Sequence, residues 1–143
     1  MTIEPISSIE EVSALLAECA LPVSDLSAPE PLQFFGIREG GALAAVVGLE
    51  LYPPVGLLRS LAVRSGCRNR GFARELVSFA ESFSAARGVT TLYLLTTTAD
   101  RFFIGLGYSA TSRGSAPPAI QTTTQFSSIC PTSSAFLSKH LGT

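Results

Sequence analysis

The segment Arg68–Val77 (RNRGFARELV) places three arginines and one glycine around the start of an expected helix. Carboxylates rather than cations usually stabilise a helix N-terminus, because the helix dipole is positive there. Free backbone N–H groups at such a terminus bind anions. Five of the ten basic residues lie between Arg59 and Arg74, although the whole chain carries a net charge of −1. The pattern therefore predicts a binding site for a small polyanion.

The bulk composition limits the classes of partner. A net charge of −1 argues against nucleic acid or an anionic membrane as the main partner. With 143 residues, 46% of them hydrophobic and 15% charged, the chain is expected to form one domain over residues 1–143.

The cysteines and the N-terminus indicate the compartment. Cys19, Cys67 and Cys130 are far apart and lack metal-ligand spacing, so no metal site is expected and the thiols suit a reducing cytoplasm. The first residues do not resemble a signal peptide, and no apolar stretch is long enough to span a bilayer. We therefore expect a cytoplasmic protein.

Hydrophobic periodicity and turn residues predict the order of the elements. Strands are expected at 2–5, 34–38, 42–52, 57–64, 92–96 and 135–139, and helices at 9–19, 71–86, 99–105 and 119–126. Residues 20–31 and 109–118 are expected to be irregular. Strands come first, and strands and helices then alternate, which predicts an α/β sheet of mixed direction.

Two motifs then carry a resemblance to a known family. The strand end Leu61–Val63 (LAV) and the loop Arg68–Ala73 (RNRGFA) resemble the coenzyme A-binding core of the GNAT superfamily of N-acetyltransferases, whose loop pattern is Arg/Gln-x-x-Gly-x-Gly/Ala. The stretch Ala99–Tyr108 (ADRFFIGLGY) resembles the next motif of that superfamily. The resemblance implies the GNAT fold, an α/β fold with a mixed, mostly antiparallel central sheet, splayed middle strands and flanking helices. It also implies acetyl-CoA as the co-substrate.

A closer likeness extends to the C-terminal tail. The stretches LLRSLAV, LYLLTTTADRFF, PPAIQTTTQF and CPTSSA resemble the arsenic-resistance N-acetyltransferases of this superfamily. The likeness implies acetylation of a small amine, in this subgroup an amino-acid-like compound linked to arsenic resistance. Acetylation of an unrelated amine and a CoA-binding sensor without turnover stay open as alternatives. The uncharged, apolar residues 126–137 are a candidate surface for a homodimer.

The resemblance assigns the polyanion site to the pyrophosphate of acetyl-CoA. Gly71 lets the backbone approach the phosphates closely, and the neighbouring N–H groups and arginines bind them. In the resembled fold, pantetheine lies between the strands 57–63 and 92–96, with the N–H of Val63 donating to the thioester oxygen. The residues expected to bind the cofactor are Leu61, Ala62, Val63, Arg68, Asn69, Arg70, Gly71, Phe72, Ala73, Arg74, Thr96 and Phe103.

Glu50 and Arg59 are the candidate catalytic residues. Glu50 is the only acid of its strand, and it would take the ammonium proton of the acceptor directly or through water. Alternation predicts that Arg59 lies on the same face as Leu61 and Val63. There its guanidinium either clamps a substrate carboxylate or pairs with Glu50, and the two roles are compatible.

Phe103 departs from the resembled motif, which often has a tyrosine that protonates the departing thiolate. Phenylalanine cannot donate a proton, but a thiol pKa of about 8.5 makes the CoA thiolate a tolerable leaving group. Thr96 stands where many relatives have asparagine, and it either bonds to pantetheine or forms a turn. Tyr93 alternates with two leucines, and it either reaches the site or, as we expect, packs in the core.

Overall fold

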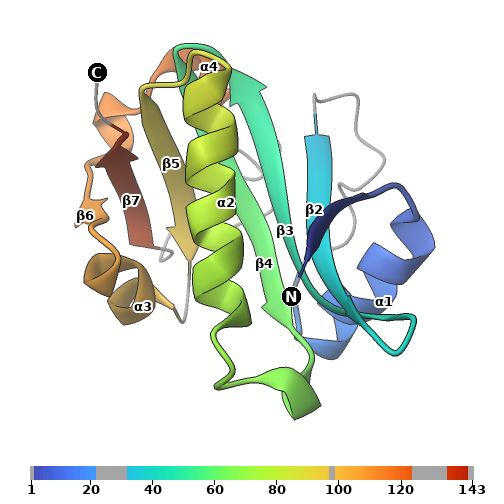
Figure 1. Cartoon of the computed structure of the whole chain (residues 1–143). Coiled ribbons are helices and arrows are strands. Elements are labelled where there is room, and N and C mark those ends of the chain that lie inside the picture. Colours follow the sequence, from blue (N-terminus) through green and yellow to red (C-terminus); the bar gives the residue numbers. More distant parts are fainter. Residues whose placement is uncertain (1, 22–31, 97–98, 124–134, 142–143) are drawn as a thin grey trace.

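Short apolar runs separated by glycine, proline and polar residues form the elements of an α/β sheet. The computed structural model describes residues 2–21, 32–96, 99–123 and 135–141 (Figure 1). The strands are β1 (Ile3–Ile6), β2 (Leu32–Glu39), β3 (Ala42–Tyr52), β4 (Val55–Val63), β5 (Thr91–Thr96), β6 (Ser109–Ala110) and β7 (Ala135–His140). The helices are α1 (Ile9–Glu18), α2 (Phe72–Ala86), α3 (Asp100–Gly105) and α4 (Pro118–Gln121), with single 3-10 turns at Ser65–Cys67 and Arg113–Ser115.

The strands form one mixed sheet in the order β1-β2-β3-β4-β5-β7-β6. All neighbouring pairs are antiparallel except β4 and β5, which are parallel. The parallel pairing covers only Val55–Leu57 against Thr91–Tyr93. Beyond that point the two strands diverge toward their C-terminal ends, near which α2 begins (Figure 1). The expected splayed middle strands are therefore confirmed.

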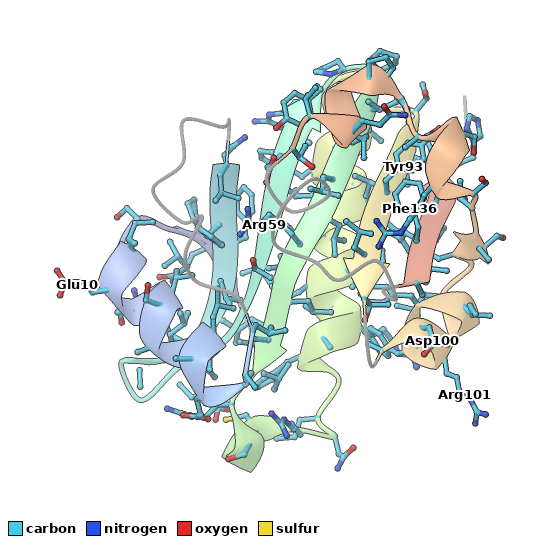
Figure 2. All side chains as sticks on the ribbon, turned by 180° about the vertical axis from the view of Figure 1, so that it is seen from behind. Glu10, Arg59, Tyr93, Asp100, Arg101 and Phe136 are labelled. Carbon is cyan, nitrogen blue, oxygen red and sulfur yellow. The ribbon has the colours of Figure 1, made fainter. Side chains whose placement is uncertain are left out.

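Helices cover both faces of the sheet. The apolar face of α2 packs on one face, where the largest core cluster includes Val47, Leu49, Leu58, Leu76, Val77, Ala80, Leu92 and Leu94. On the opposite face, the apolar stripe of α1 packs against Phe34 and Val46, and α4 packs against Leu57 through Ile120 (Figure 2). None of the helices in the described ranges is long and apolar enough to cross a membrane.

Several expected boundaries differ from the observed ones. β4 begins at Val55 because the two prolines 53 and 54 alone make the preceding turn. The segment 109–118, expected to be irregular, contains β6, which pairs with the free edge of β7. The expected helix at 119–126 begins at Pro118 and ends at Gln121, and residues 124–126 lie outside the described part of the chain. Most of the expected irregular segment 20–31 also lies outside it.

A β-bulge interrupts β4 at the point where the sheet opens. Between the pairs Val46–Ala62 and Gly48–Arg59, two residues of β4 oppose one residue of β3. One of the two, Ser60, has a φ of 56°, in the left-handed region. An extra residue of this kind shifts the alternation of side chains by one position.

The bulge corrects the expected orientation of Arg59. This side chain lies on the face of Glu50 and Leu57, opposite α2, whereas Leu61 and Val63 pack against the core cluster under α2. The expectation that Arg59 shares a face with Leu61 and Val63 was wrong, because it assumed a strand without a bulge.

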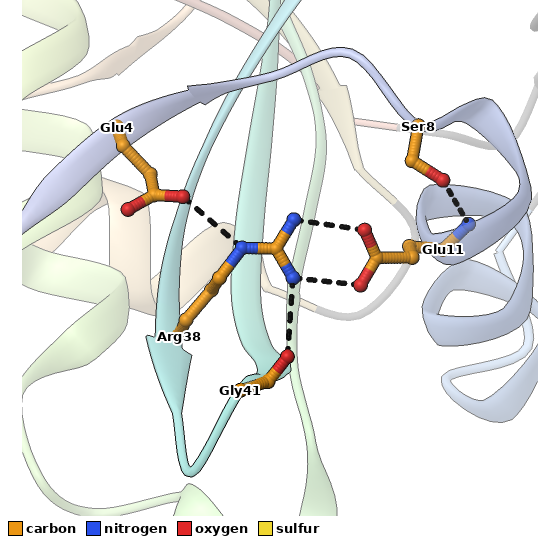
Figure 3. Close-up of polar contacts among 5 residues, drawn as sticks. All are labelled: Glu4, Ser8, Glu11, Arg38 and Gly41. Atoms are coloured by element: carbon orange, nitrogen blue, oxygen red, sulfur yellow. Dashed lines mark hydrogen bonds and ion pairs between the residues drawn. The ribbon is translucent and has the colours of Figure 1, made fainter.

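The partly buried guanidinium of Arg38 joins the first elements of the chain (Figure 3). Arg38 of β2 donates from Nε to Glu4 of β1 at 3.0 Å, and from its terminal nitrogens to both carboxylate oxygens of Glu11 at 2.7 and 2.8 Å. Glu11 is held in place because Ser8 caps α1 and accepts its backbone N–H. The hydrogen bonds from Arg38 lower the pKa of Glu11 below its ordinary value of 4.5.

We predict that Glu11→Gln lowers thermal stability at neutral pH and that this difference disappears in acid. The folded pKa of Glu11 is lower than the unfolded one, so its stabilisation is present above about pH 4.5 and is lost as the pH falls through the folded pKa. Melting curves of both proteins at a series of pH values test this.

The matched control is Glu10→Gln. Glu10 lies beside Glu11 in the first turn of α1, but its side chain projects into solvent (Figure 2). A loss of stability that is the same for both variants, or that does not change with pH, would contradict the role of the Arg38 contact.

Candidate active site

The divergence of β4 from β5 leaves an open backbone edge on β4. Within the described residues, no residue of β4 after Leu57 pairs with β5. The N–H of Arg64 donates to the carbonyl of Ala44 on β3 at 2.8 Å. Because successive N–H groups of a strand point in opposite directions, the N–H of Val63 points away from β3 and into the gap. This orientation fits the donor role expected for Val63.

The mouth of the gap carries Arg68. Its Nε donates to the carbonyl oxygen of Val63 at 3.0 Å, and the thiol of Cys19 donates to the same oxygen at 3.5 Å. The Arg68 guanidinium is therefore fixed beside the last residue of β4. The positive charge of Arg68 therefore lies at the open end of the gap, beside Val63.

The start of α2 has the features of an anion site. Gly71, its N-cap, has a φ of 82°, and no side chain caps the helix. The N–H of Glu75 bonds to the carbonyl of Gly71 at 3.0 Å, whereas the three preceding N–H groups have no partner one turn earlier. A Cβ built on Gly71 would meet no atom within 4 Å, so the space in front of the helix is open. The expected binding residues fit a pyrophosphate at this position.

The arginines of the loop have different surroundings. Arg70 donates through both terminal nitrogens to the carboxylate of Glu39, one contact measuring 2.8 Å, and lies over the ring of Phe72 at 4.9 Å. This guanidinium lowers the pKa of Glu39. Arg74 is exposed and has no ion-pair partner within the described ranges. Arg70 is thus balanced by an acid that the sequence reasoning did not single out.

Glu50 and Arg59 form a buried ion pair. A terminal nitrogen of Arg59 donates to Oε2 of Glu50 at 2.9 Å, and the two side chains are 1% and 0% exposed. The hydroxyl of Tyr52 donates to Oε1 of Glu50 at 2.6 Å, and Nε of Arg59 donates to the hydroxyl of Ser60 at 3.0 Å. Of the two roles considered for Arg59, the pairing with Glu50 is the one present here.

Tyr52 was missed by the sequence reasoning. It stands two residues after Glu50 on the same strand, and side chains at that spacing share a face. The spacing of two residues could have indicated that Tyr52 lies beside Glu50. With both oxygens bonded, the Glu50 carboxylate is held in one orientation.

An aromatic pair lies on the same face as this ion pair. Pairing across three strands aligns Glu50, Leu57 and Tyr93 in one row. Tyr93 is half-buried and stacks on Phe136, with centroids 5.4 Å apart and planes inclined by 13°. Figure 2 shows Arg59, Tyr93 and Phe136 on the side turned away from α2.

Phe103 and Thr96, which were expected to bind the cofactor, have contacts within the protein. Phe103 is buried and packs edge-on against Phe102 at 5.2 Å and Tyr108 at 5.5 Å. Thr96 accepts the backbone N–H of Ala99 through its hydroxyl at 3.0 Å, which is the turn-forming alternative. The described residues contain no group of three or more histidines, cysteines or acids that would hold a metal ion.

Comparison with known proteins gives a family match and several similar structures. The chain matches the acetyltransferase (GNAT) family over residues 5–108. Its fold is similar to that of N-acetylglutamate synthase from Neisseria gonorrhoeae complexed with coenzyme A and N-acetyl-glutamate, with a TM-score of 0.78 and 18% identity, over 99% of this chain and 35% of that chain. The chain thus spans about a third of that enzyme.

Two further structures are similar over nearly their whole length. An aminoglycoside 6′-N-acetyltransferase complexed with coenzyme A has a TM-score of 0.73 and 17% identity, over 100% of this chain and 98% of that chain. An acetyltransferase from Staphylococcus aureus has a TM-score of 0.72 and 18% identity, over 99% and 100%. No curated protein sequence matches the chain significantly. The fold implied by the sequence motifs is therefore confirmed.

We predict that Arg59→Met destabilises the protein by about 3–5 kcal/mol, because it leaves the Glu50 carboxylate buried without its cation. The double variant Arg59→Met with Glu50→Leu should cost less than this single change, because no buried charge remains. Urea unfolding of each variant measures the free energies.

Arg74→Met is the matched control for loss of an arginine. It changes an exposed position and should shift the free energy of unfolding by no more than about 0.5 kcal/mol. Additive losses in the double variant would contradict a direct interaction between the two buried side chains.

Proposed function

Because the chain belongs to the acetyltransferase (GNAT) family, we propose that it transfers the acetyl group of acetyl-CoA to the amine of a small molecule. The observation that carries this proposal is the open edge of β4, which leads to the uncapped N-terminus of α2. An unpaired strand edge binds an extended chain with amide groups, and a free helix N-terminus binds phosphates. Pantetheine and pyrophosphate are joined in this order in coenzyme A.

The binding residues divide by the part of acetyl-CoA that they would hold. The backbone of Leu61, Ala62 and Val63 would pair with pantetheine. The loop and first turn of α2 would hold the pyrophosphate, through Asn69, Arg70, Gly71, Phe72 and Ala73, with charge from Arg68 and Arg74. Thr96 and Phe103 complete the proposed set at the other side of the gap.

The chemistry requires a neutral amine beside a polarised thioester. Bound acetyl-CoA supplies the activated acetyl group. The N–H of Val63 acts as a donor to developing negative charge, and Glu50 takes the proton of the amine through a water molecule. Arg59 and Tyr52 hold the Glu50 carboxylate in one orientation, so they position the base.

The acceptor class is proposed from the charges on the sheet. Glu50 is the only acid in β3, β4, β5 and β7, and it is paired with Arg59. A polyamine needs several carboxylates, so these strands favour an acceptor with a single amine. The likeness to the arsenic-resistance subgroup extends the proposal to an amino-acid-like amine connected with arsenic resistance. Of the similar proteins named above, one is an N-acetylglutamate synthase and another is an aminoglycoside 6′-N-acetyltransferase. An unrelated amine is therefore the second candidate for the acceptor.

We also propose a cytoplasmic location and a homodimer as hypotheses. Of the candidate dimer surface 126–137, Ala135–Leu137 belong to β7 and pair with β5 and β6 of the same chain, and residues 126–134 lie outside the described part.

We predict that acetyl-CoA raises the melting temperature, because a ligand that binds only the folded state stabilises it. Gly71→Ala should greatly reduce this rise, since a φ of 82° is strained for any residue with a Cβ. Melting curves with and without saturating acetyl-CoA measure both effects.

The matched control is Gly66→Ala in the same loop. A Cβ at Gly66 would also meet no atom within 4 Å, but that glycine does not have a positive φ. It should keep the full ligand-induced rise. A wild-type protein whose melting is indifferent to acetyl-CoA would refute the proposed function.

A further inference from the structure

We propose that Glu39, at the end of β2, is a positioning residue for the cofactor: through Arg70 and Cys67 it holds the loop 68–71 in the conformation that binds the pyrophosphate of coenzyme A. This inference rests on the proposed function and adds to it a residue outside the loop and outside the expected binding set. Glu39 makes no contact with the phosphates and acts on the affinity through the loop.

The loop has a backbone conformation that needs support. Asn69 and Gly71, on either side of Arg70, have φ values of 64° and 82°, both in the left-handed region. This region is costly for a residue with a Cβ, although asparagine tolerates it better than most. In the described part of the chain, no N–H of residues 69–71 donates to a backbone carbonyl. Side-chain contacts therefore have to hold these residues in place.

Glu39 contacts this segment at two points. Arg70 donates through both terminal nitrogens to the two carboxylate oxygens, with one of the distances 2.8 Å. The thiol of the buried Cys67, at the end of the 3-10 turn before the loop, donates to Oε1 of the same carboxylate at 3.6 Å. A guanidinium bonded in this bidentate way is fixed in orientation as well as in position. Glu39 therefore connects the middle of the loop to the turn that precedes it.

The contacts with Glu39 anchor the loop to a strand that lies outside the cofactor gap. The hairpin between β2 and β3 and the loop before α2 both lie in the lower part of Figure 1. On the other side, Arg68 donates to the carbonyl oxygen of Val63 at the end of β4. The loop is thus anchored to β2 through Arg70 and to β4 through Arg68. An anchored loop presents its N–H groups to a ligand with little further loss of entropy.

A carboxylate at this place has two effects on an anionic ligand, and they have opposite signs. As a charge, Glu39 repels phosphate and occupies Arg70, so its removal should tighten binding. As an anchor, it raises the fraction of molecules whose loop is competent to bind, so its removal should weaken binding. The ion pair with Arg70 offsets the charge of Glu39, which leaves the anchoring effect as the larger one. The direction of the change in affinity tests the inference.

The test measures the Kd of coenzyme A and of dephospho-CoA, which lacks the 3′-phosphate, by isothermal titration calorimetry at low ionic strength. Glu39→Gln removes the charge and keeps the size of the side chain. Arg70→Lys keeps the positive charge and loses the bidentate contact. If the loop without its anchor is competent for about a tenth of the time, each variant raises the Kd about tenfold. Both ligands contain the pyrophosphate, so we expect the same factor for both.

The matched control is Glu75→Gln. Glu75 is in the first turn of α2, so its carboxylate is also close to the anion site. It is exposed, and within the described residues it has no side-chain hydrogen bond or ion pair. The same loss of charge should therefore leave the Kd of coenzyme A unchanged or lower it. Melting curves without ligand show that each variant is folded at the temperature of the titration.

The outcomes separate this inference from the proposed function. If the wild-type protein binds coenzyme A and Glu39→Gln binds it equally well or more tightly, the inference is overturned and the proposed function stands. The inference is also overturned if Arg70→Lys weakens the binding of coenzyme A but not of dephospho-CoA, because Arg70 then contacts the 3′-phosphate. If the wild-type protein binds neither ligand, the proposed function fails, and the inference fails with it.

Discussion

The candidate site depends on the unequal pairing of the two edges of β4. One edge pairs with β3 between Val55 and Val63, while the other pairs with β5 at three positions in the described part of the chain. Unpaired backbone groups are costly when they are buried, so an edge of this kind is stable only where solvent or a ligand satisfies it. The antiparallel pairing on the β3 side keeps the open edge rigid. The proposed binding of acetyl-CoA would therefore use groups that folding has already positioned, which limits the entropy lost by the protein.

The bulge at Ser60 divides the functions of β4 between the two faces of the sheet. Before the bulge, Arg59 points away from α2 and meets Glu50; after it, Leu61 and Val63 pack toward α2. A regular strand would place all three on one face, and a charged guanidinium would then enter the apolar core under α2 at high cost. One extra residue thus allows a buried ion pair at Arg59 and an apolar contact with the α2 side at Leu61, two residues later.

The sequence predicts the local features well and the non-local ones poorly. The loop beginning at Arg68, the helix that follows it and the apolar β5 all follow from neighbouring residues. The orientation of Arg59 depends on a register shift against β3, and no residue near it signals a bulge. Likewise Glu39 meets Arg70 only because the β2–β3 hairpin folds beside the loop. Expectations from spacing alone fail where a partner lies far away along the chain.

The Glu39–Arg70 pair bears on how a chain of net charge −1 can bind a polyanion. A carboxylate near the anion site weakens phosphate binding by charge repulsion, which is appreciable at the distances within one loop. Its two bonds to Arg70 offset most of that charge and also hold the guanidinium over Phe72. In the proposed binding mode, the remaining attraction would come from Arg68, Arg74 and the N–H groups at the start of α2. Backbone donors have fixed positions and cannot be neutralised by a neighbouring acid, so the site depends on the conformation of the loop more than on the number of its arginines.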